Sequence, residues 1–235
     1  WRRKLTDMIK EWIKACSQAL SSKAKLKQCF SNFDVYKTSF TAVDLELTSL
    51  NPSKTQITSV GYVSGIGSRI DLSSCGYHVI NTTADLGQSP VIHGLTLDVL
   101  QKGENLAQAI DALAPLFQQH VLIFHNARLD LTALNRAFKQ CGAPKINVLY
   151  IDTLQLALYQ LNKQHQVLPS NSATLSVCRQ RLGLPAFNEH NALDDALATL
   201  QLFLAQLTEL GITREATLDC LIHTGAVGRI QLGDS

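Results

Sequence analysis

Patterns of apolar residues divide the chain into a helical N-terminal part and a larger mixed part. Apolar side chains recur at helical spacing through the first 30 residues. They form a single stripe made of Leu5, Met8, Ile9, Trp12, Ile13, Cys16 and Leu20. A strand that ends near Glu46 is predicted next. Residues 55–64 and 77–81 predict two more strands of an antiparallel meander.

Helices and strands alternate through the rest of the chain. Residues 121–124 are continuously apolar, which is typical of a central strand covered on both faces. Another strand is predicted at 148–151, and apolar spacing predicts helices at about 96–102, 104–118, 127–140, 173–182, 192–210 and 213–222. We therefore predict an α/β domain over residues 37–235, with a mixed five-stranded sheet flanked by helices. Residues 1–36 are predicted to form a basic helical extension.

The first strand of this domain carries two carboxylates on one face. Along residues 41–48, Val43, Leu45 and Leu47 alternate with Ala42, Asp44 and Glu46. Two like charges so close repel each other, and burying either one costs several kcal/mol, roughly, unless something compensates. A divalent cation is the simplest compensation. The alternative is an edge strand whose polar face is solvated.

Two later segments bring further carboxylates. Asp130 lies in the first turn of the predicted helix that follows the apolar strand, and Asn126 is a candidate N-cap for that helix. Asp130 shares a helical face with Leu134 and Ala137, which predicts that it points inward. Asp195 lies beside the apolar stripe at the start of the last long helix, five residues after His190.

Composition and charge narrow the possible classes of protein. The chain has 235 residues, of which 46% are hydrophobic and 17% charged, so it can bury a core. No apolar run reaches the roughly 18 residues that span a bilayer, so we expect no membrane contact. The six cysteines are scattered without a Cys-x-x-Cys pair. That pattern predicts neither a zinc site nor a disulfide framework, and it is typical of a cytoplasmic protein.

Charge is distributed unevenly along the chain. Eight basic and two acidic side chains give the first 30 residues a charge of +6, and the total of +2 leaves −4 for the remainder. A basic arm of this kind is predicted to contact nucleic-acid phosphates or a partner protein such as a polymerase or repair complex. The alternative is a helix that packs on the domain with a solvated basic face.

Three motifs in order then resemble a known family. Asp44-Leu-Glu46, His125-Asn-Ala-Arg-Leu-Asp130 and His190-Asn-Ala-Leu-Asp-Asp195 are similar to the three exonuclease motifs of the DEDDh branch of the DnaQ-like 3′–5′ exonucleases. The polymerase III epsilon proofreading subunit typifies that branch. The resemblance covers about residues 38–210 and implies an RNase H-like fold. Ile151-Asp-Thr153 before a helix is a smaller echo of the same family.

The resemblance also assigns roles to individual residues. Asp44, Glu46, Asp130 and Asp195 are implied ligands of two Mg²⁺ or Mn²⁺ ions, for which carboxylate oxygens are suitable donors. His190 is implied as the general base, because imidazole accepts protons near neutral pH.

The sequence departs from the family pattern after Glu46, where Leu47 replaces the usual Thr and Ser49 the usual Gly. The pocket for the terminal nucleotide is therefore expected to differ. Candidate substrate contacts are Leu47, Thr48, His93 and Asn126.

The resulting hypothesis is a metal-dependent exonuclease that removes nucleotides from single-stranded or unpaired 3′ ends, with DNA as the favoured substrate. One alternative is a ribonuclease of the same branch, similar to RNase T or oligoribonuclease. A further alternative is a binding subunit of a polymerase or repair complex that has the fold without turnover.

Overall fold

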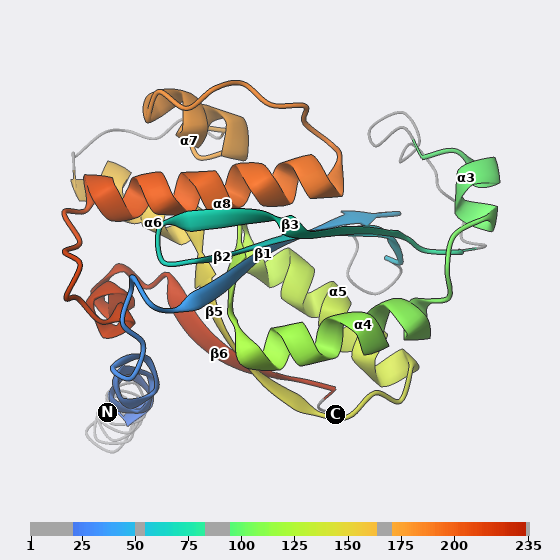
Figure 1. Cartoon of the computed structure of the whole chain (residues 1–235), viewed down its shortest axis with the longest axis horizontal. Helices are drawn as coiled ribbons and strands as arrows, with labels where there is room; N and C mark the ends of the chain where they lie inside the picture. The colour runs from blue at the N-terminus through green and yellow to red at the C-terminus, as the bar shows by residue number, and fades with distance from the viewer. Residues whose placement is uncertain (1–20, 50–54, 83–94, 164–170, 234–235) are drawn as a thin grey trace, which may run out of the picture.

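A six-stranded mixed sheet forms the centre of the molecule, and its strand order is β3-β2-β1-β4-β5-β6 (Figure 1). The computed structural model describes residues 21–49, 55–82, 95–163 and 171–233. The strands are β1 (Ser39–Leu47), β2 (Ile57–Ile66), β3 (Arg69–Val79), β4 (Val121–Phe124), β5 (Ile146–Asp152) and β6 (Val227–Leu232). Strands β1, β4 and β5 run parallel, whereas β2, β3 and β6 pair antiparallel to their neighbours.

Helices cover both faces of this sheet. Helices α4 (Leu106–Gln119) and α5 (Ala127–Gln140) lie on one face. On the other face lie α6 (Thr153–Lys163), α7 (Leu175–Arg181) and α8 (Ala192–Glu209). The short helix α3 (Leu97–Gln101) follows the meander, and a 3₁₀ helix, η1 (Leu218–Thr224), precedes β6.

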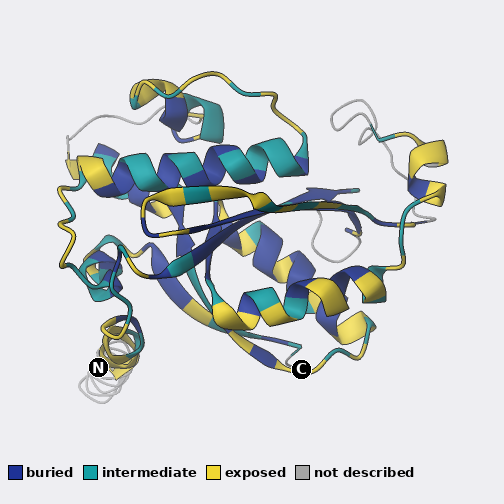
Figure 2. Cartoon of the chain, viewed as in Figure 1, coloured by how far each residue is buried: buried dark blue, intermediate teal, exposed yellow. Residues whose placement is uncertain are grey.

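The apolar core is divided between the two faces of the sheet, as the buried residues in Figure 2 show. Val43, Leu45 and Leu47 of β1 pack with α4 and α5, whereas Ala42 packs with α8. The predicted alternation of β1 is therefore confirmed, and it places Asp44 and Glu46 on the face that α8 covers.

The α/β class and most of the predicted elements are confirmed, with three corrections. The sheet has six strands where five were predicted, because β6 was missed. Strand β3 runs over Arg69–Val79 rather than 77–81, and a 3₁₀ helix at Leu218–Thr224 replaces the helix predicted at 213–222. Both missed strand segments are polar or interrupted by glycine and lie at the edges of the sheet, where one-sided pairing does not require a continuous apolar run.

The described end of the predicted extension packs against the domain. Residues 1–20 lie outside the described residues, and residues 21–30 are helical, with Lys23, Lys25 and Lys27 exposed. Phe30 is fully buried in the core on the α8 face. The predicted boundary at residue 36 stays a prediction, and a deletion that tests the arm must leave Phe30 in place.

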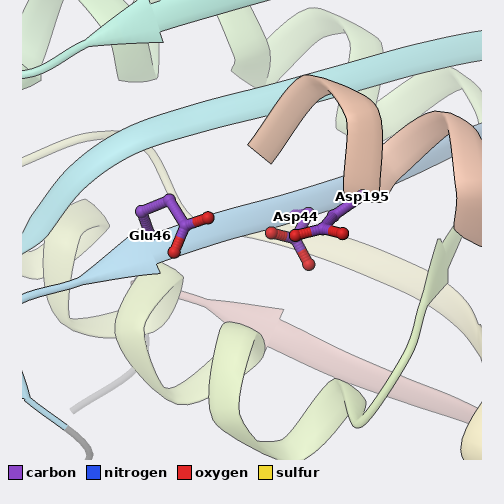
Figure 3. A group of neighbouring side chains, drawn as sticks. All are labelled: Asp44, Glu46 and Asp195. Atoms are coloured by element: carbon purple, nitrogen blue, oxygen red, sulfur yellow. The ribbon is translucent and has the colours of Figure 1, made fainter. Parts of the chain in front are cut away.

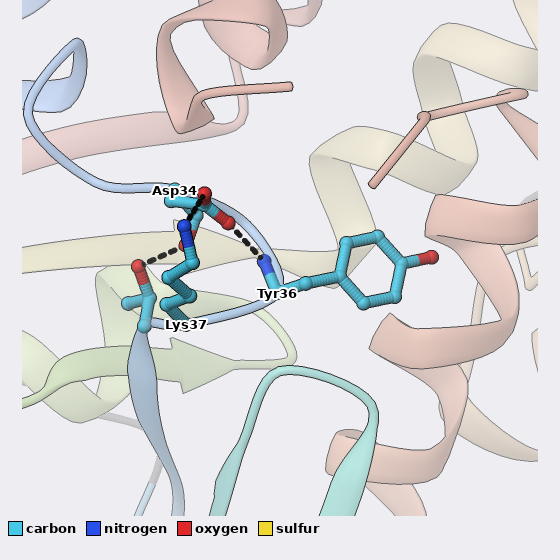
Figure 4. Close-up of polar contacts among 4 residues, drawn as sticks. Asp34, Tyr36 and Lys37 are labelled. Atoms are coloured by element: carbon cyan, nitrogen blue, oxygen red, sulfur yellow. Dashed lines mark hydrogen bonds and ion pairs between the residues drawn. The ribbon is translucent and has the colours of Figure 1, made fainter. Parts of the chain in front are cut away.

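A compact turn at residues 34–38 leads the chain into β1 (Figure 4). The Asp34 carboxylate accepts the Tyr36 backbone N–H at 3.0 Å and pairs with Lys37 Nζ at 3.0 Å. The Asp34 carbonyl oxygen accepts the Thr38 hydroxyl at 2.6 Å, and Asp34 bridges to Thr217. These contacts fix the start of β1.

Within the described ranges, no helix has the length and apolar character needed to cross a bilayer.

Packing between β1 and α8 depends on an aromatic pair, and its removal is our first prediction. Phe40 and Phe203 are buried edge to face, with ring centroids 5.1 Å apart. We expect Phe203→Ala to lower the free energy of unfolding by about 3–5 kcal/mol, because it removes buried surface and leaves a cavity. Leu72→Ala is the control, since Leu72 is 63% exposed, and it should change stability by about 0.5 kcal/mol or less. Urea unfolding measures both values, and equal effects would contradict the assignment of this core.

Candidate active site

The candidate site begins where β1 loses one of its two neighbours. Strand β2 pairs with β1 along its length, but β4 pairs only with Phe40, Thr41 and Ala42. Beyond Ala42, the edge of β1 on the β4 side is open to other groups. Asp44 and Glu46 lie in this stretch.

Asp130 fills part of this open edge. It lies in the first turn of α5 and is buried together with Leu134 and Ala137, as its helical face predicted. The Leu45 backbone N–H lies close to its carboxylate and favours the charged form. Asp130 therefore reaches β1 between Asp44 and Glu46, although it comes from the opposite layer of helices.

Asp195 arrives from the other face through the first turn of α8. The Asn191 side chain caps this helix by accepting the backbone N–H groups of Leu193 at 3.0 Å and Asp194 at 3.3 Å. The capped turn lies directly on β2 at Gly61, which is paired with Asp44. A Cβ atom at Gly61 would lie 2.1 Å from the Ala192 carbonyl carbon, so only glycine allows this approach.

Asp44, Glu46 and Asp195 form the carboxylate cluster, with one oxygen from each lying within 4.8 Å of the others. Figure 3 shows the carboxylates of Asp44 and Asp195 side by side, and that of Glu46 directed toward them from further along β1. These three residues are the potential metal ligands that the described part of the chain brings together. Asp130 lies outside it but within electrostatic reach of Asp44.

Crowding and burial disfavour the charged forms of these carboxylates. Burial raises the pKa of Asp44 well above its ordinary value, and the charges of Asp130, Asp195 and Glu46 raise it further. Burial is also the main cause that raises the pKa of Asp195, to about 7, and the Glu46 charge adds to it. Several oxygen donors that repel one another are a suitable set for a divalent cation, which would offset the repulsion. The residues present therefore fit such an ion.

His190 lies at the entrance to α8. It is exposed and has a left-handed backbone with φ of 69°. Its backbone N–H donates to Asp195 Oδ2 at 3.1 Å, which ties the loop to the cluster. This hydrogen bond holds the backbone of His190 next to Asp195. The role of the imidazole as general base stays a prediction.

Comparison with known proteins agrees with this geometry. The profile of the RNase_T exonuclease family matches residues 41–203, a range that includes every member of the cluster, Asp130 and His190. The chain belongs to the exonuclease family.

The chain is also similar to part of a much longer enzyme. It is 28% identical over 190 residues to the DNA polymerase III PolC-type of Thermotoga maritima. That match covers 79% of this chain, which spans only 13% of the length of the relative.

Solved structures show the same fold. E. coli exonuclease I, in a zinc-bound complex with single-stranded DNA, is 18% identical with a TM-score of 0.59, and the match covers 75% of this chain and 42% of that one. Exonuclease X, in complex with 5′ overhanging duplex DNA, is 19% identical with a TM-score of 0.56, and the match covers 77% of this chain and 98% of that one. The predicted RNase H-like fold is thereby confirmed.

The candidate substrate contacts have different surroundings in the structure. Leu47 is only 6% exposed and packs in the core with α5, and Thr48 Oγ1 accepts the Gln56 backbone N–H at 3.0 Å. His93 lies outside the described residues. Asn126 occupies the N-cap position of α5, but its side chain makes no capping hydrogen bond, and its backbone is left-handed with φ of 76°. Asn126 is therefore at the predicted N-cap position, although its side chain does not cap the helix, and the four substrate contacts stay predictions.

Two residues near the site were missed in the sequence. Gly61 carried no signal beyond a glycine within a strand, a position that often marks close approach of another backbone. Asp152 was noted only as part of a small motif. Its carboxylate supplies the capping contacts that Asn126 does not, by accepting the Asn126 N–H at 3.0 Å and the Ala127 N–H at 3.1 Å.

Our second prediction concerns Gly61. Gly61→Ala should displace the first turn of α8 and carry Asp195 away from the cluster, because the added Cβ would overlap the backbone of Ala192. We expect Mn²⁺ binding, measured by calorimetry, to weaken by about 100-fold.

Gly65→Ala is the matched control for Gly61→Ala. Gly65 lies on the same strand, and its added Cβ would meet a backbone atom, the Arg69 carbonyl oxygen, at 2.3 Å. Its nearest neighbours are in the β2–β3 hairpin rather than in α8. This variant should lose stability but keep Mn²⁺ affinity. Equal losses of affinity in both variants would refute a specific role for Gly61.

The third prediction is a pH dependence of the metal-free protein. Folded Asp195 has a pKa of about 7 against 3.8 for the free side chain, so between these values the folded state binds more protons than the unfolded chain. The contribution of Asp195 to the free energy of unfolding therefore falls as the pH rises from 3.8 to about 7. Relative to Asp195→Asn, the wild type should lose stability between pH 4 and pH 7 in chelator, as urea unfolding would show. Asp98→Asn, on the exposed surface of α3, should follow the wild type, and parallel curves for all three proteins would contradict the prediction.

Proposed function

We propose that this protein is a divalent-metal-dependent exonuclease that shortens single-stranded or unpaired DNA from the 3′ end. The observation that carries the proposal is the meeting of Asp44, Glu46 and Asp195 within 4.8 Å, inside the range that matches the exonuclease family. A divalent cation would offset the mutual repulsion of these carboxylates, which come from two distant segments of the chain.

In this proposal, Asp44, Glu46 and Asp195 hold divalent cations, and Asp130 completes the set from the open edge of β1. Two Mg²⁺ or Mn²⁺ ions bound there would activate a water molecule and stabilise the charge that develops on the phosphate and the leaving 3′ oxygen. The chain itself sets the spacing of the ligands. The Leu45 N–H orients the Asp130 carboxylate, and the His190 N–H orients that of Asp195.

His190 serves as the general base. Its backbone N–H bonds to Asp195, which keeps the residue next to the cluster, and its side chain is exposed to water. A neutral imidazole nitrogen can take the proton of an attacking water at physiological pH.

Support for a DNA substrate comes from the proteins that this chain resembles. The polymerase relative makes DNA, and the two structures described above were solved with DNA bound. Because the chain spans a small part of that polymerase, cooperation with a polymerase or repair complex is a proposal as well. The exposed lysines at 23, 25 and 27 are the described part of the basic surface that such a partner or a DNA strand would contact.

The fourth prediction tests the reaction directly. A 5′-labelled DNA oligonucleotide with an unpaired 3′ end, incubated with Mg²⁺ or Mn²⁺, should give a ladder that shortens from the 3′ end. EDTA should abolish it. Asp44→Ala should slow the reaction by about 1,000-fold or more, and His190→Ala by about 100- to 10,000-fold.

Asp194→Asn is the matched control, because Asp194 adjoins Asp195 but lies outside the carboxylate cluster. It should retain the wild-type rate within about threefold. An RNA oligomer of the same sequence distinguishes the ribonuclease alternative, which would be favoured by faster hydrolysis of RNA. A folded protein that binds Mn²⁺ yet leaves both polymers intact would refute the proposal and favour a binding subunit.

A further inference from the structure

Asp152 is a buried carboxylate next to the candidate site that the proposed reaction does not use. It ends β5, is only 6% exposed, and belongs to the Ile151-Asp-Thr153 motif noted in the sequence. No lysine or arginine pairs with it among the residues that the structure describes. A buried charge without a cation needs other compensation.

Backbone N–H groups supply that compensation, and they come from the first turns of two different helices. Asp152 Oδ1 accepts the N–H of Leu154, at the start of α6, at 2.9 Å. The same oxygen accepts the Asn126 N–H at 3.0 Å, and Oδ2 accepts the Ala127 N–H, at the start of α5, at 3.1 Å. A carboxylate is favoured at helix N-termini because their N–H groups lack partners within the helix.

For α5 this contact replaces the missing cap. Asn126 has a left-handed backbone, which asparagine tolerates better than most residues with a side chain but which is still less favourable than the right-handed one. The hydrogen bonds from Asn126 and Ala127 to Asp152 restrain this conformation. They fix the point and the direction in which α5 leaves β4.

Asp130 lies one helical turn beyond this fixed point. Its carboxylate meets the Leu45 N–H on the open edge of β1, so any shift of the first turn of α5 changes that contact. A shift of this turn would therefore move Asp130 relative to β1.

The junction that bears Asp152 is itself anchored on its far side. The neighbouring Thr153 hydroxyl lies 3.0 Å from the Phe124 carbonyl oxygen and 2.8 Å from His125 Nδ1. The Thr153 carbonyl oxygen accepts Gln206 Nε2, from α8, at 2.9 Å. These contacts connect the junction to the end of β4 and to the helix that carries Asp195.

We propose that Asp152 is a positioning residue: its carboxylate holds the N-terminus of α5 so that Asp130 reaches the edge of β1 beside Asp44 and Glu46. Only the effect of Asp152 on catalysis rests on the proposed function, because its backbone contacts do not depend on that function. Asp152 is not a member of the carboxylate cluster, and both of its oxygens are already engaged by backbone donors.

The fifth prediction uses Asp152→Asn, which keeps the size and shape of the side chain. One amide oxygen can still accept the N–H groups of Asn126 and Leu154, but an NH₂ group then faces the Ala127 N–H. Asn105→Ala is the matched control, because Asn105 caps α4 through the Ala107 N–H at 2.8 Å and has no contact with the cluster. Both variants should lower the urea midpoint of unfolding.

The decisive measurement is hydrogen exchange of the Leu45 amide by NMR in the metal-free protein. The Leu45 amide lies on β1, whereas Asp130 lies on α5 and Asp152 on β5. Its exchange therefore reports the position of Asp130 without bound metal or catalytic activity. Asp152→Asn should speed its exchange by about tenfold or more, relative to the amides of β4, and Asn105→Ala should not. Unchanged exchange in Asp152→Asn would overturn the proposal.

Kinetics then show the catalytic consequence. In the exonuclease assay, well below the unfolding temperature, Asp152→Asn should lower kcat by about 100-fold with little change in KM, and Asn105→Ala should alter neither. If kcat of Asp152→Asn equals that of the wild type, the positioning role in catalysis is refuted. If the wild type has no activity but the Leu45 amide responds as expected, the proposed function fails while the positional role of Asp152 stands.

Discussion

Repulsion among crowded and partly buried carboxylates is the constraint on which the rest of this structure depends. Asp195 reaches Asp44 and Glu46 because the first turn of α8 lies against β2 at Gly61, where a side chain would keep the helix and the strand apart. The apolar layer beneath α8, which includes Phe203 and Leu200, holds the helix down against this repulsion. Packing energy elsewhere in the domain thus maintains a local arrangement that is unfavourable without a cation.

The topology of the sheet decides where this arrangement can form. Strands β1, β4 and β5 are parallel, and Asp44, Asn126 and Asp152 all lie toward their carboxyl ends. Open α/β sheets bind ligands at this edge, because the chain turns away from the sheet there and leaves backbone groups and helix N-termini facing a common space. The short pairing of β4 with β1 widens that space and admits Asp130 from the opposite layer.

The elements and faces that the sequence predicts correctly are those that the spacing of neighbouring apolar residues reveals. The alternation in β1 and the helical spacing in α5 and α8 are properties of neighbouring residues, so Asp44, Asp130 and Asp195 were placed on the right elements and faces. Strand β6 and most of β3 were missed because edge strands need no continuous apolar run. Gly61 and Asp152 were missed because their importance comes from contacts with residues far away in the sequence, and no local period reports such contacts.

A cation that binds only the assembled cluster is linked to the stability of the whole domain. The unfolded chain separates β1 from α8 and has no site of comparable affinity, so binding stabilises the folded state in proportion to occupancy. The same linkage acts on each element that positions a ligand. Loosening α8 at Gly61, or α5 at Asp152, reduces the affinity of the cluster even where the ligands are unchanged, because part of the binding energy must then restore their positions. The backbone contacts that hold the carboxylates are therefore as much a part of the site as the carboxylates themselves.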